Sequence, residues 1–180
     1  VHTSILTALI SGVLMIFVGI FFSRPALELM DTPSDVIELA TLYMRIYFVG
    51  MPFFMLYNYG AAILRAVGDT KRPLIFLVVS GVTNACLNLL LVIVFKMDVA
   101  GVAIATVISQ MISCVLVLTC LYKTDAVYQF RFKKLRIKWE YLVQIFRIGI
   151  PAGIQGAIFS VSNVFIQSGI NSFGENAIAG

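Results

Sequence analysis

Residues 64–90 read LRAVGDTKRPLIFLVVSGVTNACLNLL and join a charged turn to an apolar run. The charges of the turn surround Gly68, and residues 73–95 then contain none, which is enough chain to span a hydrocarbon core of about 30 Å. Asn84 and Asn88 lie four residues apart in this run, so both amides occupy one face of the predicted helix. An unpaired amide in hydrocarbon is costly. The pair therefore predicts either a polar contact between helices, worth about 0.6 kcal/mol for each amide, or a ligand site.

The composition places this run in a membrane protein. Of the 180 residues, 60% are hydrophobic and 12% are charged, whereas soluble domains are about 25% charged. We therefore predict an all-α integral membrane protein, a polytopic helical bundle. Five spans can be drawn, over residues 4–22, 36–64, 73–95, 99–122 and 148–173. The second is interrupted by Glu38, Arg45 and Pro52, although its uncharged part, residues 46–64, is long enough alone.

Basic residues are concentrated in two of the connections between spans. The turn between the second and third spans holds three, and residues 123–147 hold seven: Arg65, Lys71 and Arg72, then Lys123, Arg131, Lys133, Lys134, Arg136, Lys138 and Arg147. The other connections hold Arg24 and Lys96 alone. Because the two basic connections share one side if every span crosses, the positive-inside rule places them in the cytoplasm of a plasma-membrane protein. The acidic loop around Asp31 and Asp35 is then external.

Aromatic and basic residues alternate over residues 128–136. This pattern favours a segment lying against anionic lipid headgroups. A nucleic-acid patch is disfavoured because the segment adjoins two spans, so no nucleic-acid partner is expected. Arg45, the one charge well inside a span, is expected to reach the interface or to pair with Glu38.

The fourth and fifth spans also carry polar or small residues at helical spacing. Gly101, Ala105, Ser109 and Ser113 form a small-residue ridge that permits close helix contact, with Thr106 beside it. Gly156, Ser160, Asn163 and Gln167 share one face, with Gln155 to one side. Each pattern alone is typical of packing, but together they favour helices around an aqueous cavity. No Ser/His/Asp set, phosphate-binding glycine loop or pair of membrane carboxylates appears, so we predict a protein that is not an enzyme and has no cofactor.

Four blocks of the chain resemble the multidrug and toxic compound extrusion (MATE) family. They are LRAVGDTKRP at residues 64–73, NACLN at residues 84–88, GVAIATVISQ at residues 101–110, and Pro151 with Gln155. The resemblance implies a fold of twelve helices in two six-helix lobes with a cavity between them. Residues 1–122 would be helices three to six of the first lobe, residues 123–147 the cytoplasmic connection between lobes, and residues 148–180 the start of the second lobe with helix seven.

The resemblance also implies a secondary antiporter that exports small organic cations in exchange for Na⁺ or H⁺ by alternating access. Its partners would be the lipid bilayer and the remaining helices of the same transporter. In some members a cation site uses an Asp on helix one, an Asn and an acid one turn apart on helix five, and a Thr on helix six. Asn84 matches that Asn and Thr106 falls where the Thr is expected, but Asn88 stands in place of the acid. An amide offers an oxygen to a hard cation but cannot carry a proton, so proton coupling through Asn88 is disfavoured and the coupling ion stays open.

Asn58, Gln155 and Asn163 are further candidates for residues that line the cavity. One alternative function is a lipid-linked saccharide flippase of a related fold, which should place basic residues inside the spans to hold pyrophosphate. Arg45 alone meets this condition. A membrane scaffold that transports nothing is a second alternative, and it predicts that replacing Asn84 or Asn88 by Leu leaves function intact.

Overall fold

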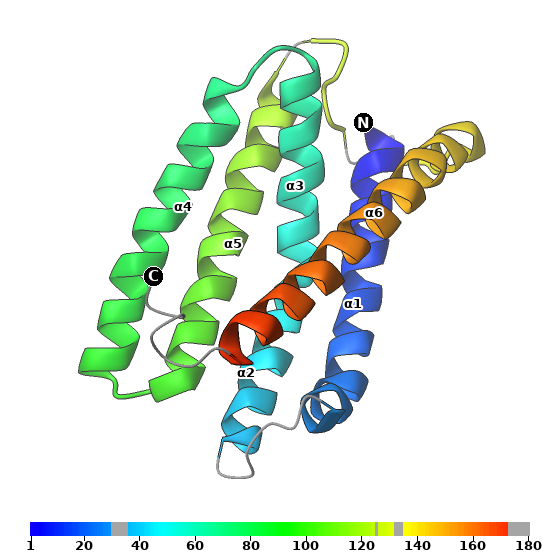
Figure 1. Ribbon diagram of the computed structural model, residues 1–180. Coiled ribbons are helices and arrows are strands. Elements are labelled where there is room, and N and C mark those ends of the chain that lie inside the picture. The colour runs from blue at the N-terminus through cyan, green and yellow to red at the C-terminus, as the bar shows by residue number, and fades with distance from the viewer. Residues whose placement is uncertain (30–35, 125, 132–134, 173–180) are drawn as a thin grey trace. The chain divides into compact units, whose positions relative to one another are not determined.

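The computed structural model describes residues 1–29, 36–124, 126–131 and 135–172, with side chains as far as Asn163. The elements in these ranges are helices: α1 (His2–Leu29), α2 (Ile37–Val49), α3 (Met51–Ala66), α4 (Lys71–Leu89), the short π-helix η1 (Leu90–Val94), α5 (Asp98–Lys123) and α6 (Trp139–Ser172). The chain divides into two compact units, Val1–Ile137 and Lys138–Gly180 (Figure 1). The first holds α1 to α5, and the second holds α6.

The five predicted spans are confirmed when one bent pair of helices counts as a single span. Four helices are long and apolar enough to cross a membrane: α1, α4 with η1, α5 and α6 over Trp139–Asn163. The second predicted span consists of α2 and α3, which meet at Gly50 with a bend of 45°. Pro52 lies in the first turn of α3. Proline has no N–H to continue the hydrogen bonds of α2, which is why the predicted interruption becomes a break.

The last helix begins before the uncharged span, in agreement with the helical face that Leu142, Ile145 and Phe146 predict ahead of it. It begins at Trp139, whereas the predicted span began at residue 148. Residues 139–147 carry charges, but their apolar side chains recur at helical spacing, so the helix extends beyond the uncharged run. This part of the predicted linker between lobes is therefore helical.

Close approaches at glycine hold α1, α3 and α5 together in the first unit. A Cβ at Gly12 of α1 would lie 2.4 Å from Pro52 Cα, and a Cβ at Gly60 of α3 would lie 2.9 Å from Val117 Cγ2 of α5. Side chains at these positions would collide with their neighbours, so the small residues set the distances between the helices. Helix α5 also packs against α2 and α4, which makes it the centre of the first unit.

The turn between α3 and α4 ends one helix and begins the next. Gly68 has a φ of +88°, its N–H donates to Arg65 O, and the Asp69 N–H donates to Leu64 O 2.9 Å away. This pair of bonds is a Schellman motif, in which glycine is preferred because its left-handed backbone strains other residues. The Asp69 carboxylate then accepts a bond from the Arg72 N–H at 3.1 Å. Pro73 is buried, and its carbonyl oxygen accepts the Tyr57 hydroxyl of α3 at 2.9 Å.

The basic α3–α4 turn and the described start of the basic connection after α5 lie at one end of the first unit (Figure 1). The α3–α4 turn and the segment after α5 lie at the end that also holds the N-terminus, while the α4–α5 turn lies at the opposite end (Figure 1). This arrangement is the one that the charge count predicts. Lys133 and Lys134 of that count, and Asp31 and Asp35 of the loop expected to be external, lie outside the described residues.

The alternation of basic and aromatic residues predicts that the segment after α5 lies on the surface, but one of its aromatic residues is buried. Phe130 is 2% exposed and packs in the core of the first unit with Leu64 and Leu121. Its N–H donates to Leu121 O at 2.9 Å, and the His2 ring stacks on its ring. The prediction of a headgroup-facing segment is therefore wrong at Phe130. Burial of this apolar ring against the ends of the helices removes its surface from water, which lowers the free energy of the folded state.

Candidate functional site

The candidate site lies in the seam between α4 and α5. The small-residue ridge of α5 is buried as predicted, at Gly101, Ala105, Ser109 and Ser113. Ser80 of α4 is also buried, and its hydroxyl donates to Ser109 O at 2.7 Å. The two helices therefore approach closely enough for short polar side chains to bridge them.

Four side chains make a continuous polar network across this seam. The Asn88 amide nitrogen donates to Asn84 Oδ1 at 3.0 Å, which links the two amides along α4. The Asn84 nitrogen reaches across to α5, 3.3 Å from Ser109 Oγ and 3.4 Å from Thr106 Oγ1. We call Asn84, Asn88, Thr106 and Ser109 the seam network.

The hydroxyl groups of the network are anchored on their own helix. Thr106 donates to Val102 O at 2.9 Å, and Ser109 donates to Thr106 O at 2.8 Å. Each hydroxyl donates its single hydrogen to a carbonyl oxygen of α5 and therefore presents an oxygen lone pair to Asn84. The seam thus has oxygen acceptors on both helices.

One oxygen in the seam has no hydrogen-bond partner among the described residues. Asn88 Oδ1 is buried and makes no hydrogen bond with any described group. Leaving a buried acceptor unsatisfied costs about 1–3 kcal/mol, so such an atom requires an explanation. It lies two residues before the π-helix η1, where Phe95 N–H bonds to Leu90 O at 3.2 Å, and short π-turns within helices are frequent at functional sites.

The chemistry of the network is that of a neutral oxygen cluster. Amide and hydroxyl oxygens are the ligands that hard cations prefer, and none of the four side chains titrates near neutral pH. In the described part of the chain, no group of three or more His, Cys, Asp or Glu side chains is placed to hold a metal ion. The seam can therefore offer ligands to an alkali cation, but it cannot release or take up a proton.

The structure brings together the three residues of the predicted cluster, Asn84, Asn88 and Thr106. Their role in binding a cation stays a prediction. Ser109 was expected in the small-residue ridge but not in the cluster. Its spacing of three residues from Thr106 was the available signal, because residues three apart lie on one side of a helix.

The three weaker candidates lie elsewhere. Asn58 of α3 donates to Phe54 O of its own helix at 2.8 Å. Gln155 and Asn163 are exposed on α6 of the second unit, where Ser160 donates to Gly156 O. Gln167 lies outside the residues whose side chains are described. A cavity-lining role for Asn58, Gln155 and Asn163 stays a prediction.

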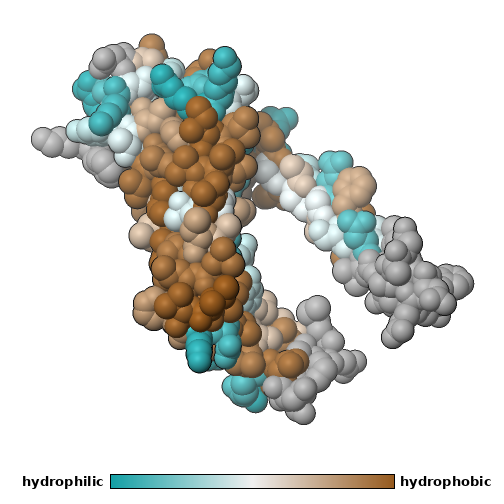
Figure 2. Space-filling model, turned by 90° about the vertical axis from the view of Figure 1, so that its left-hand side faces the viewer, coloured by the Kyte–Doolittle hydropathy of each residue, from teal (hydrophilic) through white to brown (hydrophobic). Residues whose placement is uncertain are grey.

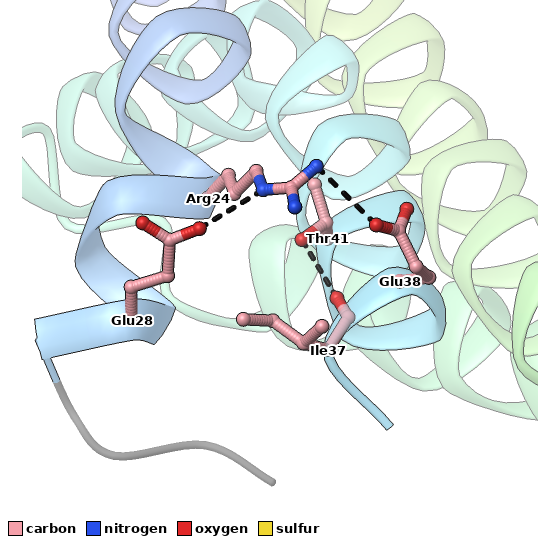
Figure 3. Close-up of polar contacts among 5 residues, drawn as sticks. All are labelled: Arg24, Glu28, Ile37, Glu38 and Thr41. Carbon is pink, nitrogen blue, oxygen red and sulfur yellow. Dashed lines mark hydrogen bonds and ion pairs between the residues drawn. The ribbon is translucent and has the colours of Figure 1, made fainter. Parts of the chain in front are cut away.

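At the end opposite the basic connections, a charged cluster links α1 to α2. Arg24 of α1 lies 3.0 Å from Glu28 and 3.3 Å from Glu38 of α2 (Figure 3). Glu38 therefore pairs with Arg24. Pairing of Glu38 with Arg45, one of the two alternatives expected for Arg45, is not found among the described residues. Arg24 is the nearer partner because the end of α1 lies beside the start of α2, whereas Arg45 is two turns further along its helix. Exposed pairs of this kind are worth about 0.2–1 kcal/mol, so the cluster contributes little to the site.

Comparisons with known proteins agree with this arrangement. The MatE family model matches residues 1–90. The chain is 37% identical over 162 residues to the probable multidrug resistance protein YpnP of Bacillus subtilis, covering 90% of this chain and 36% of that protein. It is 25% identical over 176 residues to the multidrug export protein MepA of Staphylococcus saprophyticus, covering 98% of this chain and 39% of that protein.

Two solved structures share the fold. A MOP-superfamily transporter from Pyrococcus furiosus, described as having a binding pocket of reversed polarity that suggests a different function, is 25% identical. It superposes with a TM-score of 0.87 over 97% of this chain and 39% of its own. An inward-facing multidrug resistance MATE transporter is 24% identical, with a TM-score of 0.74 over 82% of this chain and 34% of its own.

The chain spans less than half the length of each of these proteins. They are transport proteins and not enzymes, in agreement with the prediction from the sequence. The matched family model, these relatives and the apolar helices together identify a multi-pass protein of the plasma membrane that belongs to the MatE family of transporters.

Proposed function

We propose that this chain forms part of a secondary antiporter that exports small organic cations, with the seam network in contact with the coupling ion. The observation that carries the proposal is the buried Asn88 Oδ1, which makes no hydrogen bond within the described residues although it lies in a network of four polar side chains. A bound cation would satisfy this oxygen. The names of the relatives, which refer to multidrug resistance and export, support the export of drugs.

The donor set favours Na⁺ over H⁺ at this position. Proton coupling requires a group that gains and loses a proton, whereas Asn, Thr and Ser do neither near neutral pH. Na⁺ requires several oxygen ligands, which the amides and hydroxyls provide. The family resemblance assigns a further acidic ligand to a helix that precedes these in the family.

Alternating access gives a reason for placing this site in a seam. Helix α4 contacts the rest of the first unit chiefly along α5, so a cation that joins the two helices favours arrangements in which the seam is closed. A ligand shifts such an equilibrium by as much as its affinity differs between the states. Binding and release of the ion would in this way be coupled to movement of the lobe.

The direct test uses the full-length protein in sealed vesicles. Efflux of a fluorescent organic cation is followed while either a Na⁺ or a proton gradient is imposed. We expect the Na⁺ gradient to drive efflux, and Asn88→Leu to raise the Na⁺ concentration for half-maximal efflux by about 5- to 140-fold, since one lost ligand is worth about 1–3 kcal/mol. Asn84→Leu should act in the same direction.

Two threonines provide a matched control. Thr83 of α4 and Thr106 of α5 each donate to the carbonyl oxygen four residues earlier, at 2.8 and 2.9 Å, but Thr106 alone takes part in the seam network. Thr106→Val should therefore weaken the Na⁺ dependence, and Thr83→Val should not. Efflux driven equally well in all these variants would contradict the assignment of the site. No efflux under either gradient would contradict drug export itself and favour a flippase.

A further inference from the structure

A groove between α3 and α4 opens at the basic end of the first unit. It has a volume of about 320 Å³ and combines polar and apolar side chains: Tyr57, Arg65, Thr70, Lys71, Pro73, Leu74 and Leu77. We call it the α3–α4 groove. The seam network lies on α4 and α5 and contributes no residue to it.

The charges of the groove are both positive and have no acidic partner there. Arg65 and Lys71 are exposed, and neither lies within salt-bridge distance of a carboxylate among the described residues. The one acidic residue of the turn, Asp69, is engaged by Arg72, whose Nε is 3.3 Å from its carboxylate. The groove therefore attracts anions and repels the organic cations that the transporter is proposed to export.

The polar end of the groove leads onto an apolar surface. Leu74 and Leu77 line the groove, and both are more than half exposed, as is Val78 in the next turn. One turn further, nothing lies within 4 Å of the position of a Cβ at Gly81. On the face of the first unit where α4 lies, most of the surface is hydrophobic, with a paler patch near its middle and hydrophilic residues at its ends (Figure 2). A ligand that fits both parts has an anionic head and a hydrocarbon tail.

We propose that the α3–α4 groove binds an anionic phospholipid of the cytoplasmic leaflet, with its phosphate near Arg65 and Lys71 and an acyl chain along Leu74 and Val78. The positive-inside rule places this end of the helices at the cytoplasmic surface, where anionic headgroups are found. A free phosphate would satisfy the charges, but it would leave the apolar floor of the groove unused. This proposal rests on the position of the groove at the cytoplasmic surface of the membrane, and it does not require the proposed antiport function.

The test is native mass spectrometry of the full-length protein, stripped of lipid and supplied with phosphatidylglycerol or with phosphatidylcholine of the same acyl chains. We expect phosphatidylglycerol to be retained preferentially. Arg65→Gln and Lys71→Gln should each lower its retention about fivefold, and together about 30-fold, as expected for two basic residues beside an anionic headgroup. Lys123→Gln is the matched control, because Lys123 is a basic residue at the end of α5 that does not line the groove.

A second variant separates a lipid from a free anion. Leu77→Trp fills the apolar part of the groove without a change of charge, so it should lower lipid retention while binding of inorganic phosphate stays as it is. Unchanged thermal unfolding confirms that the variants fold. If Arg65→Gln does not fold, the comparison of Lys71→Gln with the unaltered protein tests the proposal by itself. Equal retention of both lipids, or an equal loss in Lys123→Gln, would overturn the proposal. The proposal would also be overturned if inorganic phosphate binding depended on Arg65 and Lys71 while lipid retention did not.

Discussion

Helices α4 and α5 are neighbours of equal apolar character, but they differ greatly in how much of their surface is packed. In the most apolar stretch of each, 6% of α4 is buried within the protein and 39% of α5. Helix α5 buries its small-residue ridge, and Val117 and Leu121, which continue the same four-residue spacing, are also buried. Helix α4 buries Pro73 and Ser80. The comparison teaches that hydropathy predicts which helices cross a membrane, whereas the positions of small residues predict which faces of those helices are packed.

The largest expected effect comes from removing a large side chain on each helix. Leu121 of α5 is fully buried against Phe130, and Leu89 of α4 is 61% exposed. Leu121→Ala should lower the free energy of unfolding by about 2–5 kcal/mol, because it leaves a cavity, and Leu89→Ala by less than about 1 kcal/mol. Equilibrium unfolding of the full-length protein in mixed micelles measures both. Equal losses would show that another part of the transporter covers the outer face of α4.

Replacing either of two glycines by alanine should change the free energy of unfolding by less, and in opposite directions. A Cβ at Gly60 of α3 would lie 2.9 Å from Val117 of α5, while nothing lies within 4 Å of a Cβ at Gly81 of α4. Gly60→Ala should destabilise by about 1–3 kcal/mol through overpacking. Gly81→Ala should stabilise by up to about 1 kcal/mol, because alanine is the better helix former. The same unfolding measurement applies, and destabilisation by Gly81→Ala would mean that a neighbour packs closely on α4.

The smallest effect concerns the contact of α4 with α3. The Tyr57 hydroxyl donates to Pro73 O at 2.9 Å and ties the start of α4 to α3. Tyr57→Phe should lower the free energy of unfolding by about 0.5–1.5 kcal/mol. Tyr59→Phe, on the same helix, is the control and should have little effect. A Tyr57→Phe variant as stable as the control would show that this hydrogen bond between α3 and α4 does not stabilise the fold.

Much of the fold follows from local chemistry that the sequence displays. The Gly68 turn, the break at Pro52 and the pairing of Asn84 with Asn88 each depend on residues close together in the chain. The approach of Thr106 to Asn84 was expected from the family resemblance and not from spacing.

The features that the sequence did not predict depend on contacts distant in the chain or on small energy differences. Burial of Phe130 requires a gap formed by α1, α3 and α5 together. The π-turn at η1 differs from an α-helix by one residue in its hydrogen-bond spacing and carries no sequence signature. Ser109 enters the network because the rotation of α5 about its axis points its hydroxyl at Asn84, and tertiary packing fixes that rotation.

The most direct test of the central claim, that the seam network binds a cation, is the dependence of thermal unfolding on Na⁺. The full-length protein is heated in NaCl and in KCl of equal ionic strength, alongside Asn88→Leu and Thr83→Val. A bound ion stabilises the folded state according to its concentration and affinity. We predict that Na⁺ raises the unfolding temperature of the unaltered protein and of Thr83→Val, and that Asn88→Leu loses this response. A full Na⁺ response in Asn88→Leu would contradict the account.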